Sequence, residues 1–238
     1  MPRKNAIITG ASGNLGLAVT AKFLAEGYSV VATVEPGKDE DKEKLHALSG
    51  SKNALEVYRV DVMNESVVQK FIADMIGQHG HIDAAIMLVG GFRMGDIQAT
   101  DEKTLDLMIS LNFKSAYFAV KPVFEHMKGQ AGGGRLVFIG ARPGFDVRTG
   151  TTSAAYALSK SLIFRLAEMI NVEGQKKNIV ASVIVPSIID TPQNRESMPN
   201  AQFDDWVKPE EVADAVLFAC SEHAAKLREP VFKVYGRS

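Results

Sequence analysis

The chain has 238 residues, of which 46% are hydrophobic and 23% are charged, with 27 basic and 28 acidic residues and a net charge of −1. This composition predicts one globular domain and excludes a disordered chain, a collagen and a membrane-spanning helix, which needs about 20 consecutive apolar residues. Because the charges are balanced, the chain lacks the basic character with which proteins bind nucleic acids or anionic membranes, so neither is an expected partner.

Apolar runs of strand length alternate with helical patterns along the chain. The predicted strands are Ala6–Thr9, Ser29–Val34, Leu55–Val60, Ile82–Val89, Arg135–Ile139, Ile179–Val185 and Val231–Val234. The predicted helices are Leu15–Glu26, Asp41–Leu48, Glu65–His79, Leu105–Met127, Ala154–Val172 and Pro209–Ser221. Apolar strands that alternate with helices are typical of a parallel sheet that is covered on both faces. The sequence therefore predicts an α/β fold, a single doubly wound Rossmann-type domain over residues 1–238 with a seven-stranded, mostly parallel sheet flanked by helices.

The remaining composition adds expectations about loops, location and metals. The charged segment Glu35–Lys44 and the glycine run Gly129–Gly134 are expected to be solvated loops. Cys220 is a single cysteine and the N-terminus lacks the features of a signal peptide, so a cytoplasmic protein is expected. The five histidines have no spacing typical of metal ligands, and we expect no metal site.

The first predicted strand runs directly into a glycine-rich turn and then into a helix. Glycines allow a sharp turn and let backbone N–H groups approach a pyrophosphate, and the N-terminus of a helix favours an anion. A turn that needs glycine only for a positive φ is the alternative. The position after the first strand favours a dinucleotide site, and its expected contacts are Gly10, Ser12, Asn14, Leu15 and Gly16.

The second predicted strand ends about 20 residues further on, at Val34 and Glu35. An acidic side chain at this place accepts hydrogen bonds from the adenosine ribose hydroxyls and repels a 2′-phosphate. The sequence therefore predicts that NADH is the preferred cofactor. NADPH is not excluded, because Lys38 is near enough in sequence to accommodate a phosphate and Glu35 can also simply begin the charged loop.

Tyr156 and Lys160 lie four residues apart in the predicted helix Ala154–Val172, so their side chains share one face. An ammonium group near a phenol favours its ionised form and brings a pKa of about 10 toward neutrality. Tyr156 is therefore a candidate proton donor or acceptor, and Lys160 can also contact a cofactor ribose. An exposed helix pair without function is the alternative, which the glycine turn and the acidic strand end disfavour.

These residues give the whole chain a resemblance to the short-chain dehydrogenase/reductase family. Thr9–Gly16 is similar to the cofactor turn of that family, Asp61 and Val62 to its adenine contact, and Tyr156 with Lys160 to its catalytic pair. The resemblance implies an NAD(P)H-dependent oxidoreductase.

The same resemblance assigns roles to further residues. It implies that Asn112 completes a proton relay with the catalytic pair and that Gly90 contacts the cofactor. It also implies that Pro186, Ile189 and Thr191 hold the nicotinamide carboxamide before the chain folds over the substrate. An amide that kinks a helix or lies at an interface is the alternative for Asn112.

The family organisation implies a cofactor half at about 1–135, a catalytic and substrate half at about 136–238, and a lid at about 187–206 within the second half. The long helices Leu105–Met127 and Ala154–Val172 resemble those that pair between subunits in this family, although the same apolar stripes can lie inside one core. We therefore expect a homodimer or homotetramer that acts on a small molecule.

One departure from the family pattern bears on the substrate. Ala141 follows the fifth predicted strand where the family has a serine that binds a substrate carbonyl, and alanine cannot donate that hydrogen bond. Nearby hydroxyl groups either replace the serine or cap the next helix; they belong to Thr149, Thr151, Thr152 and Ser153.

The C-terminal third has a more specific resemblance, to dihydropteridine reductases, through Asp190–Trp206. This resemblance implies NADH-dependent reduction of a quinonoid dihydropterin with Tyr156 as proton donor. Its candidate substrate contacts are Phe92, Ala141, Tyr156 and Met198. The ring of Phe92 would then face a flat heterocycle, although core packing is its alternative role.

Two other functions stay open. A carbonyl reductase or alcohol dehydrogenase of unknown substrate is the main alternative. A protein that binds NAD(H) without turnover is the other, and the presence of Tyr156, Lys160 and Asn112 disfavours it.

Overall fold

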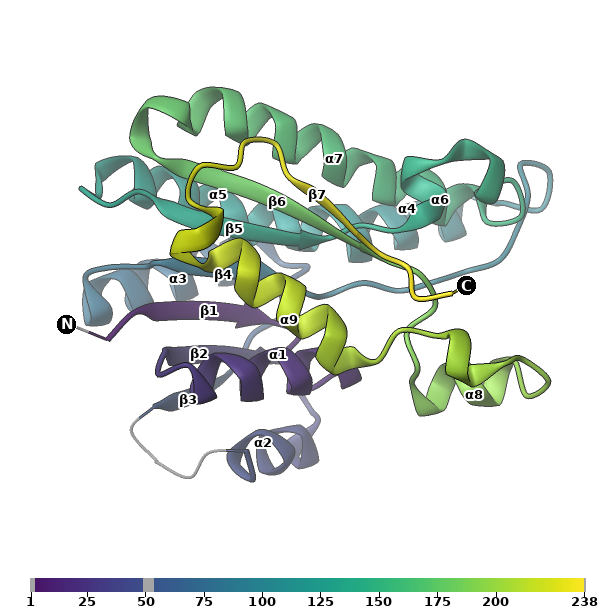
Figure 1. Cartoon of the computed structure of the whole chain (residues 1–238), viewed down its shortest axis with the longest axis horizontal. Coiled ribbons are helices and arrows are strands. Elements are labelled where there is room, and N and C mark those ends of the chain that lie inside the picture. The colour runs from purple at the N-terminus through teal and green to yellow at the C-terminus, as the bar shows by residue number, and fades with distance from the viewer. Residues whose placement is uncertain (1–2, 49–53, 238) are drawn as a thin grey trace.

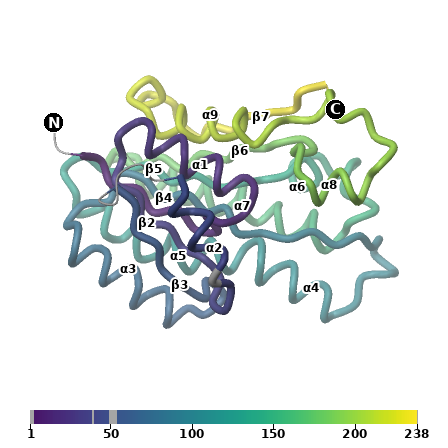
Figure 2. The backbone as a smooth tube through the Cα atoms, turned by 90° about the horizontal axis from the view of Figure 1, so that it is seen from below, coloured from purple at the N-terminus to yellow at the C-terminus, as the bar shows by residue number. Residues whose placement is uncertain are grey.

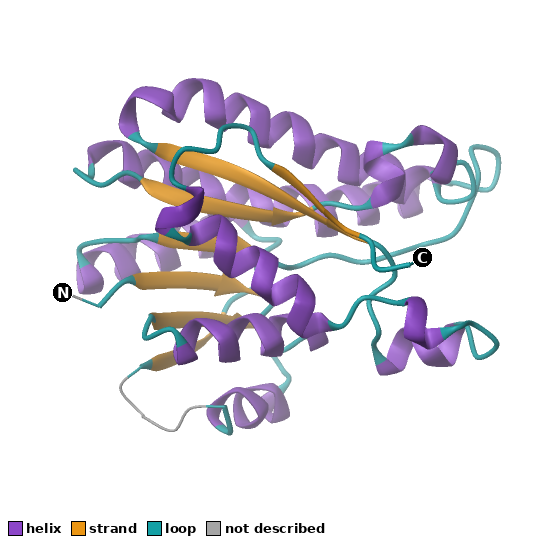
Figure 3. Cartoon of the chain, in the orientation of Figure 1, coloured by secondary structure: helices purple, strands orange, loops and turns teal. Residues whose placement is uncertain are grey.

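Parallel strands form one seven-stranded sheet in the computed structural model, which describes residues 3–48 and 54–237. The spatial order is β3-β2-β1-β4-β5-β6-β7, so the chain starts near the middle of the sheet and winds outward twice (Figures 1 and 3). The strands are β1 Asn5–Thr9, β2 Ser29–Val34, β3 Leu55–Arg59, β4 Ala84–Met87, β5 Gly134–Ile139, β6 Ile179–Pro186 and β7 Val231–Val234. Because every pair is parallel, all carboxyl ends meet at one edge. Ligands bind beyond that edge in such sheets, where the strand order reverses between β1 and β4.

Helices cover both faces of the sheet. They are α1 Asn14–Ala25, α2 Asp39–His46, α3 Glu65–His79, α4 Glu102–Ile109, α5 Ser115–Gly129, α6 Arg142–Phe145, α7 Ala154–Gly174, α8 Pro192–Ser197 and α9 Pro209–Cys220. Short 3₁₀ turns are η2 Val147–Thr149, η3 Gln175–Lys177, η4 Phe203–Asp205 and η5 Glu222–Ala224. One apolar core lies under α3, α5 and α7, and the other under α1, α2 and α9. Figure 2 shows α9 and α3 on opposite sides of the sheet.

The alternation of side chains along each strand feeds both cores. In β5, Leu136 and Phe138 enter the core under α5 and α7, whereas Val137 enters the core under α9. All three are fully buried, as expected for a strand with helices on both sides. Local signals set the helix ends: the Asn64 side chain accepts a hydrogen bond from a backbone N–H in the first turn of α3, and Gly80 ends that helix with φ 69°.

Several sequence predictions need correction. The predicted helix Leu105–Met127 is divided, because a π-helical turn, η1 Ser110–Lys114, separates α4 from α5. The predicted strand Ile82–Val89 is shorter at both ends as β4, and the sheet is parallel throughout the described residues instead of mostly parallel. The segment Glu35–Lys44 is not only a loop, because α2 begins within it. Within the described residues no helix is both long and apolar enough to cross a membrane.

Candidate active site

The glycine turn between β1 and α1 is closely packed on itself. Gly10 adopts φ +67°, which favours glycine. A Cβ on Gly16 would lie 2.3 Å from the carbonyl oxygen of Gly10 and 2.6 Å from that of Ala11. Asn14 and Leu15 are the first two residues of α1, so the helix N-terminus points into the turn. The turn fits a pyrophosphate, because it leads directly into the N-terminus of α1, where backbone N–H groups are available to an anion.

We expect Gly16→Ala to damage this turn, because its methyl group would overlap backbone atoms that cannot move independently. The expected loss is about 1–3 kcal/mol in the free energy of unfolding, the usual scale of overpacking, with weaker NADH binding. Urea unfolding and fluorescence titration with NADH measure the two effects. Gly13→Ala is the matched control for stability, because the nearest atom to its Cβ would be 3.6 Å away. Equal stability of Gly16→Ala and Gly13→Ala would contradict the prediction.

The residues predicted to bind the adenosine lie at the tips of neighbouring strands. Glu35 directly follows β2 and forms an ion pair with Lys38 at 2.5 Å, with both side chains exposed. Asp61 follows β3 by two residues, and its carboxylate accepts a hydrogen bond from the backbone N–H of Met63 at 3.0 Å. Val62 packs against the core under α3. The fold therefore brings these residues to the same edge of the sheet as the glycine turn.

Asn112 lies in the π-helical turn η1 and is fully buried. Its amide makes two hydrogen bonds with the backbone of Gly91: the N–H of Gly91 donates to Oδ1 at 2.9 Å, and Nδ2 donates to the carbonyl oxygen at 3.0 Å. A Cβ on Gly90 would lie 2.7 Å from Asn112 Oδ1 and 3.3 Å from Lys160 Nζ. The backbone after β4 thus lies as near to these side chains as glycine allows.

Tyr156 and Lys160 stand in the first half of α7. Lys160 is buried, with 6% of its surface exposed, and its Nζ donates a hydrogen bond to the carbonyl oxygen of Ile139 at 2.8 Å. Burial lowers the pKa of Lys160 to about 8 and raises the pKa of Tyr156 to about 12. The prediction that Lys160 brings the pKa of Tyr156 down is therefore wrong for this structure, because removal from water dominates.

Lys160 keeps capacity for a ligand. An ammonium group has three hydrogens to donate, and the Ile139 carbonyl is the single acceptor that Lys160 has among the described residues. The other two hydrogens fit the hydroxyl groups of a ribose. Together with the turn at Gly10 and Gly16 and the backbone at Gly90, Lys160 fits a dinucleotide that runs along the carboxyl edge of the sheet.

Ser159 is a site residue that the sequence analysis missed. Its hydroxyl donates to the backbone carbonyl oxygen of Tyr156 at 2.8 Å and accepts a hydrogen bond from Asn112 Nδ2 at 3.0 Å. Asn112 is thus tied to α7 through Ser159, and no hydrogen bond in the described part of the chain joins it directly to Lys160 or to the Tyr156 hydroxyl. The sequence signal for Ser159 is its position three residues after Tyr156, which places both side chains on neighbouring parts of the helix surface.

The ring of Phe92 stands edge-on to the ring of Tyr156, with centroids 5.0 Å apart and an interplanar angle of 80°. Phe92 is 52% exposed, so core packing is not its role. Its loop is joined to the start of α7: the N–H of Ala154 donates to the carbonyl oxygen of Gly95 at 2.7 Å, and the N–H of Gly95 donates to that of Thr152 at 2.9 Å. This backbone clamp holds the aromatic ring beside the tyrosine.

Ala141 is buried and precedes α6, just beyond the end of β5. Among the candidate replacement hydroxyls, that of Thr149 donates to the carbonyl oxygen of Asp146 at 2.8 Å. Ser153 is buried at the start of α7, but its side chain accepts no capping hydrogen bond there. The alternative role of helix capping is therefore wrong for Ser153.

The segment predicted to form a lid follows β6, which ends at Pro186. Ile189 pairs with Val207 as an isolated parallel bridge, so the two ends of this segment lie side by side. The Thr191 side chain accepts a hydrogen bond from a backbone N–H at 3.2 Å and so caps α8, while Met198 follows the last residue of that helix. Figure 1 shows α8 beyond the carboxyl ends of the strands. Met198, directly after α8, is therefore on the side of the sheet edge where ligands bind.

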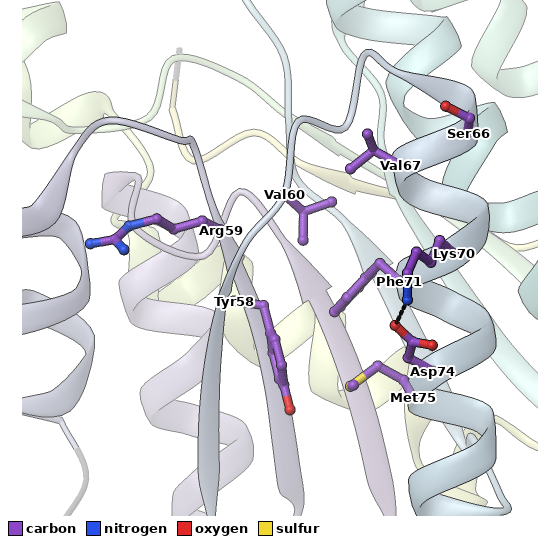
Figure 4. A pocket seen from close by; sticks show the side chains of 9 residues that line it. All are labelled: Tyr58, Arg59, Val60, Ser66, Val67, Lys70, Phe71, Asp74 and Met75. Carbon is purple, nitrogen blue, oxygen red and sulfur yellow. Dashed lines mark hydrogen bonds and ion pairs between the residues drawn. The ribbon is translucent and has the colours of Figure 1, made fainter.

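Two grooves lie outside this region. One of about 520 Å³ lies between β3 and α3, where the rings of Tyr58 and Phe71 have centroids 5.5 Å apart and Lys70 pairs with Asp74 at 2.7 Å (Figure 4). The other, of about 800 Å³, lies between α1 and α9. Neither groove is lined by a predicted site residue.

Known proteins resemble this chain in sequence and in fold. A family model described as short chain dehydrogenase matches residues 4–202. Acetoacetyl-CoA reductase of Acinetobacter sp. is 27% identical over 249 residues, which cover 98% of this chain and 97% of that protein. The 3-oxoacyl-(acyl-carrier-protein) reductase FabG of Thermotoga maritima is 25% identical over 245 residues, which cover 98% and 96%. A solved structure of ElxO with NADP bound shares the fold, with a TM-score of 0.89 at 23% identity, over 99% of this chain and 98% of that one. The chain therefore belongs to the short-chain dehydrogenase family of NAD(P)-dependent oxidoreductases.

Proposed function

We propose that this oxidoreductase reduces a small molecule with NAD(P)H and that Tyr156 donates the proton. The observation that carries the proposal is the position of Tyr156 and buried Lys160 on α7, with Lys160 next to the backbone at Gly90. A reduced nicotinamide, when bound, supplies a hydride to one atom of a double bond. The other atom of that bond must then gain a proton from the protein.

The chain's own residues support the reductive direction. Because burial raises the pKa of Tyr156 to about 12, its side chain is a protonated phenol at neutral pH and has a proton to give. Lys160 has a pKa of about 8, so it is mostly charged at neutral pH and can donate hydrogen bonds to a cofactor ribose. Asn112 and Ser159 are positioning residues, because they hold the loop after β4 against α7.

A small carbonyl compound is the first candidate substrate. The similar proteins named acetoacetyl-CoA reductase and 3-oxoacyl-(acyl-carrier-protein) reductase are, by name, reductases of 3-oxoacyl groups. In such a reaction the carbonyl carbon gains the hydride, and the carbonyl oxygen gains the proton of Tyr156 to become a hydroxyl group.

A flat conjugated heterocycle such as a dihydropterin is the second candidate, and two observations favour it. Ala141 offers no hydroxyl group to stabilise a developing oxyanion, and loss of one such donor typically costs a few kcal/mol of transition-state stabilisation. Phe92 presents an exposed aromatic ring next to Tyr156. The lid residues 190–206 add the resemblance to dihydropteridine reductases.

For the cofactor we propose a preference for NADH. The support is the carboxylate of Glu35 at the tip of β2, where it can accept hydrogen bonds from ribose hydroxyls. For the assembly we propose a homodimer or homotetramer, because α7 exposes an apolar stripe on one face that includes Leu158, Leu162 and Met169.

The deciding experiment measures the oxidation of NADH and of NADPH by the purified protein, with a 3-oxoacyl thioester, simple ketones and a quinonoid dihydropterin as separate substrates. Turnover of ketones without turnover of the pterin supports the first candidate, and the reverse supports the second. Cofactor binding without turnover on any of them would count against the proposed reaction.

Ala141→Ser separates the two candidates further. With a ketone as the native substrate, we expect the added hydroxyl group to raise kcat/KM by about tenfold, because one oxyanion donor is worth at least that much. With a conjugated heterocycle, no gain is expected. The readout is kcat/KM for each substrate, and Ala141→Cys controls for added volume. An unchanged or lower rate with ketones would speak against the carbonyl candidate.

A further inference from the structure

A side-chain contact joins the glycine turn to α2. The hydroxyl group of Ser12 donates a hydrogen bond to Asp41 Oδ2 at 2.8 Å, and Lys44 Nζ donates to Asp41 Oδ1 at 3.0 Å. Asp41 is only 8% exposed, although it lies in a strongly charged helix. The Asp41 carboxylate therefore accepts hydrogen bonds from both the Ser12 hydroxyl group and the Lys44 ammonium group.

This contact lies beside the place expected for the adenosine ribose. In dinucleotide-binding folds the ribose sits between the glycine turn after the first strand and the acidic residue at the tip of the second. Ser12 belongs to that turn, and Glu35 is that acidic residue. Asp41 is bonded to the turn itself, so it adds a second carboxylate to the same region.

Two lysines in this region are paired with carboxylates. Glu35 is paired with Lys38 at 2.5 Å, and Asp41 with Lys44 at 3.0 Å. Burial opposes ionisation of Asp41, but the hydrogen bonds from Lys44 and Ser12 outweigh it and lower the pKa of the carboxyl group. Asp41 is therefore an anion at neutral pH, and both Lys38 and Lys44 already have an anionic partner.

We propose that Asp41 is a second determinant of cofactor choice, which disfavours NADPH by binding the two groups, Ser12 and Lys44, that a 2′-phosphate would otherwise use. This inference rests on the proposed use of a nicotinamide cofactor. A phosphate needs hydrogen-bond donors and positive charge, and Asp41 occupies both while adding a negative charge that repels it. The ribose of NADH carries neutral hydroxyl groups and meets no such repulsion.

Asp41→Asn tests the proposal, because asparagine keeps the size and the acceptor oxygen but removes the charge. We expect the Kd for NADPH to fall by at least about tenfold, with the Kd for NADH changed by less than about twofold, since only the phosphate senses the charge. Fluorescence titration with each reduced cofactor measures both constants, and the rise in Tm at saturating cofactor checks them independently of activity.

Two further variants sharpen the test. Glu43→Gln removes one negative charge from the same helix at an exposed position, so it should leave both constants nearly unchanged. In the double variant Asp41→Asn with Lys44→Ala, the ammonium group that was freed is gone, and we expect most of the gain in NADPH affinity to disappear. A general effect of net charge would instead move Glu43→Gln and Asp41→Asn equally.

The outcomes distinguish this inference from the proposed function. A wild-type protein that binds neither NADH nor NADPH overturns both. The wild-type protein can bind NADH and still contradict the role of Asp41. This is the result if Asp41→Asn changes the ratio of the Kd values for NADPH and NADH no more than Glu43→Gln does, and it overturns the role of Asp41 alone. Tighter wild-type binding of NADPH than of NADH also overturns it.

Discussion

Replacement of Tyr156 by phenylalanine is expected to lower kcat for reduction by at least about 100-fold, the usual minimum for loss of a general acid. The variant keeps the aromatic ring, so the edge-on contact with Phe92 remains. Only the hydroxyl group, which is the proposed proton donor, is removed. The Kd for NADH should stay within about twofold of the wild-type value. Steady-state or stopped-flow assays measure kcat, and titration of the same preparation with NADH measures Kd.

Tyr117→Phe is the matched control for this experiment. Tyr117 lies on α5, is 38% exposed and contacts the rings of Phe113 and Phe118. Its loss of a hydroxyl group should leave kcat unchanged. If Tyr156→Phe kept more than about a tenth of wild-type kcat, Tyr156 would not be the proton donor.

Replacement of Lys160 by methionine should abolish most activity and yet stabilise the cofactor-free protein. The lysine is buried with one hydrogen bond, and burial lowers its pKa from the ordinary value of 10.5 to about 8. A shift of this size corresponds to about 3 kcal/mol that folding loses while the group is charged in both states. After loss of the hydrogen bond to Ile139, we expect a net gain of about 2 kcal/mol in the free energy of unfolding at neutral pH.

The stability difference between Lys160→Met and the wild-type protein should depend on pH, whereas a change in packing alone would not. Below the folded pKa of about 8, Lys160 is charged in the folded and unfolded states, and the penalty is complete. Between about 8 and about 10.4 the unfolded chain binds the extra proton, so the stability of the wild-type protein rises with pH. Above this window the penalty is gone, and Lys160→Met should be less stable than the wild-type protein by about 1 kcal/mol, the contribution of the lost hydrogen bond.

Urea unfolding at several pH values measures the difference, and Lys176→Met is the control. Lys176 is exposed in the turn after α7, so the same substitution there should change little at any pH. A loss of stability for Lys160→Met at neutral pH would show that the buried ammonium group has partners that stabilise it.

The fold could be predicted because its strands carry the signal in their own residues. All eight side chains of β6 are buried, and a run of that kind fits only a strand covered on both faces. The turn at Gly10–Gly16 likewise carries its signal locally, since the glycines are needed where backbone atoms nearly touch. Because this turn follows the first strand, its position predicts that the cofactor half comes before the catalytic half in the chain.

The division of the long helix could not be predicted in this way. A π-helical turn adds one residue to a helical turn, and neither composition nor apolar spacing in Ser110–Lys114 marks it. Its effect is to bury Asn112 against Gly91 and Ser159. The family resemblance pointed to Asn112, whereas its actual partners depend on how two distant segments pack.

The direction of the pKa shift of Tyr156 also could not be predicted from the sequence. Spacing places Lys160 on the correct face of α7, but the direction of its ammonium group depends on the Ile139 carbonyl, which comes from another element. The balance between burial and charge is therefore set by tertiary structure. The contact between Ser12 and Asp41 is equally non-local, because it joins residues 29 positions apart.

The backbone clamp between Gly95 and the start of α7 has a consequence for how this enzyme can evolve. It joins the loop of Phe92 to the helix of Tyr156 through main-chain atoms, so the connection depends little on side chains other than the glycine that φ +148° requires at Gly95. The segment proposed as a lid is attached separately, at the pairing of Ile189 with Val207. We therefore expect mutations in that segment to change the substrate without separating the proposed proton donor from its aromatic neighbour.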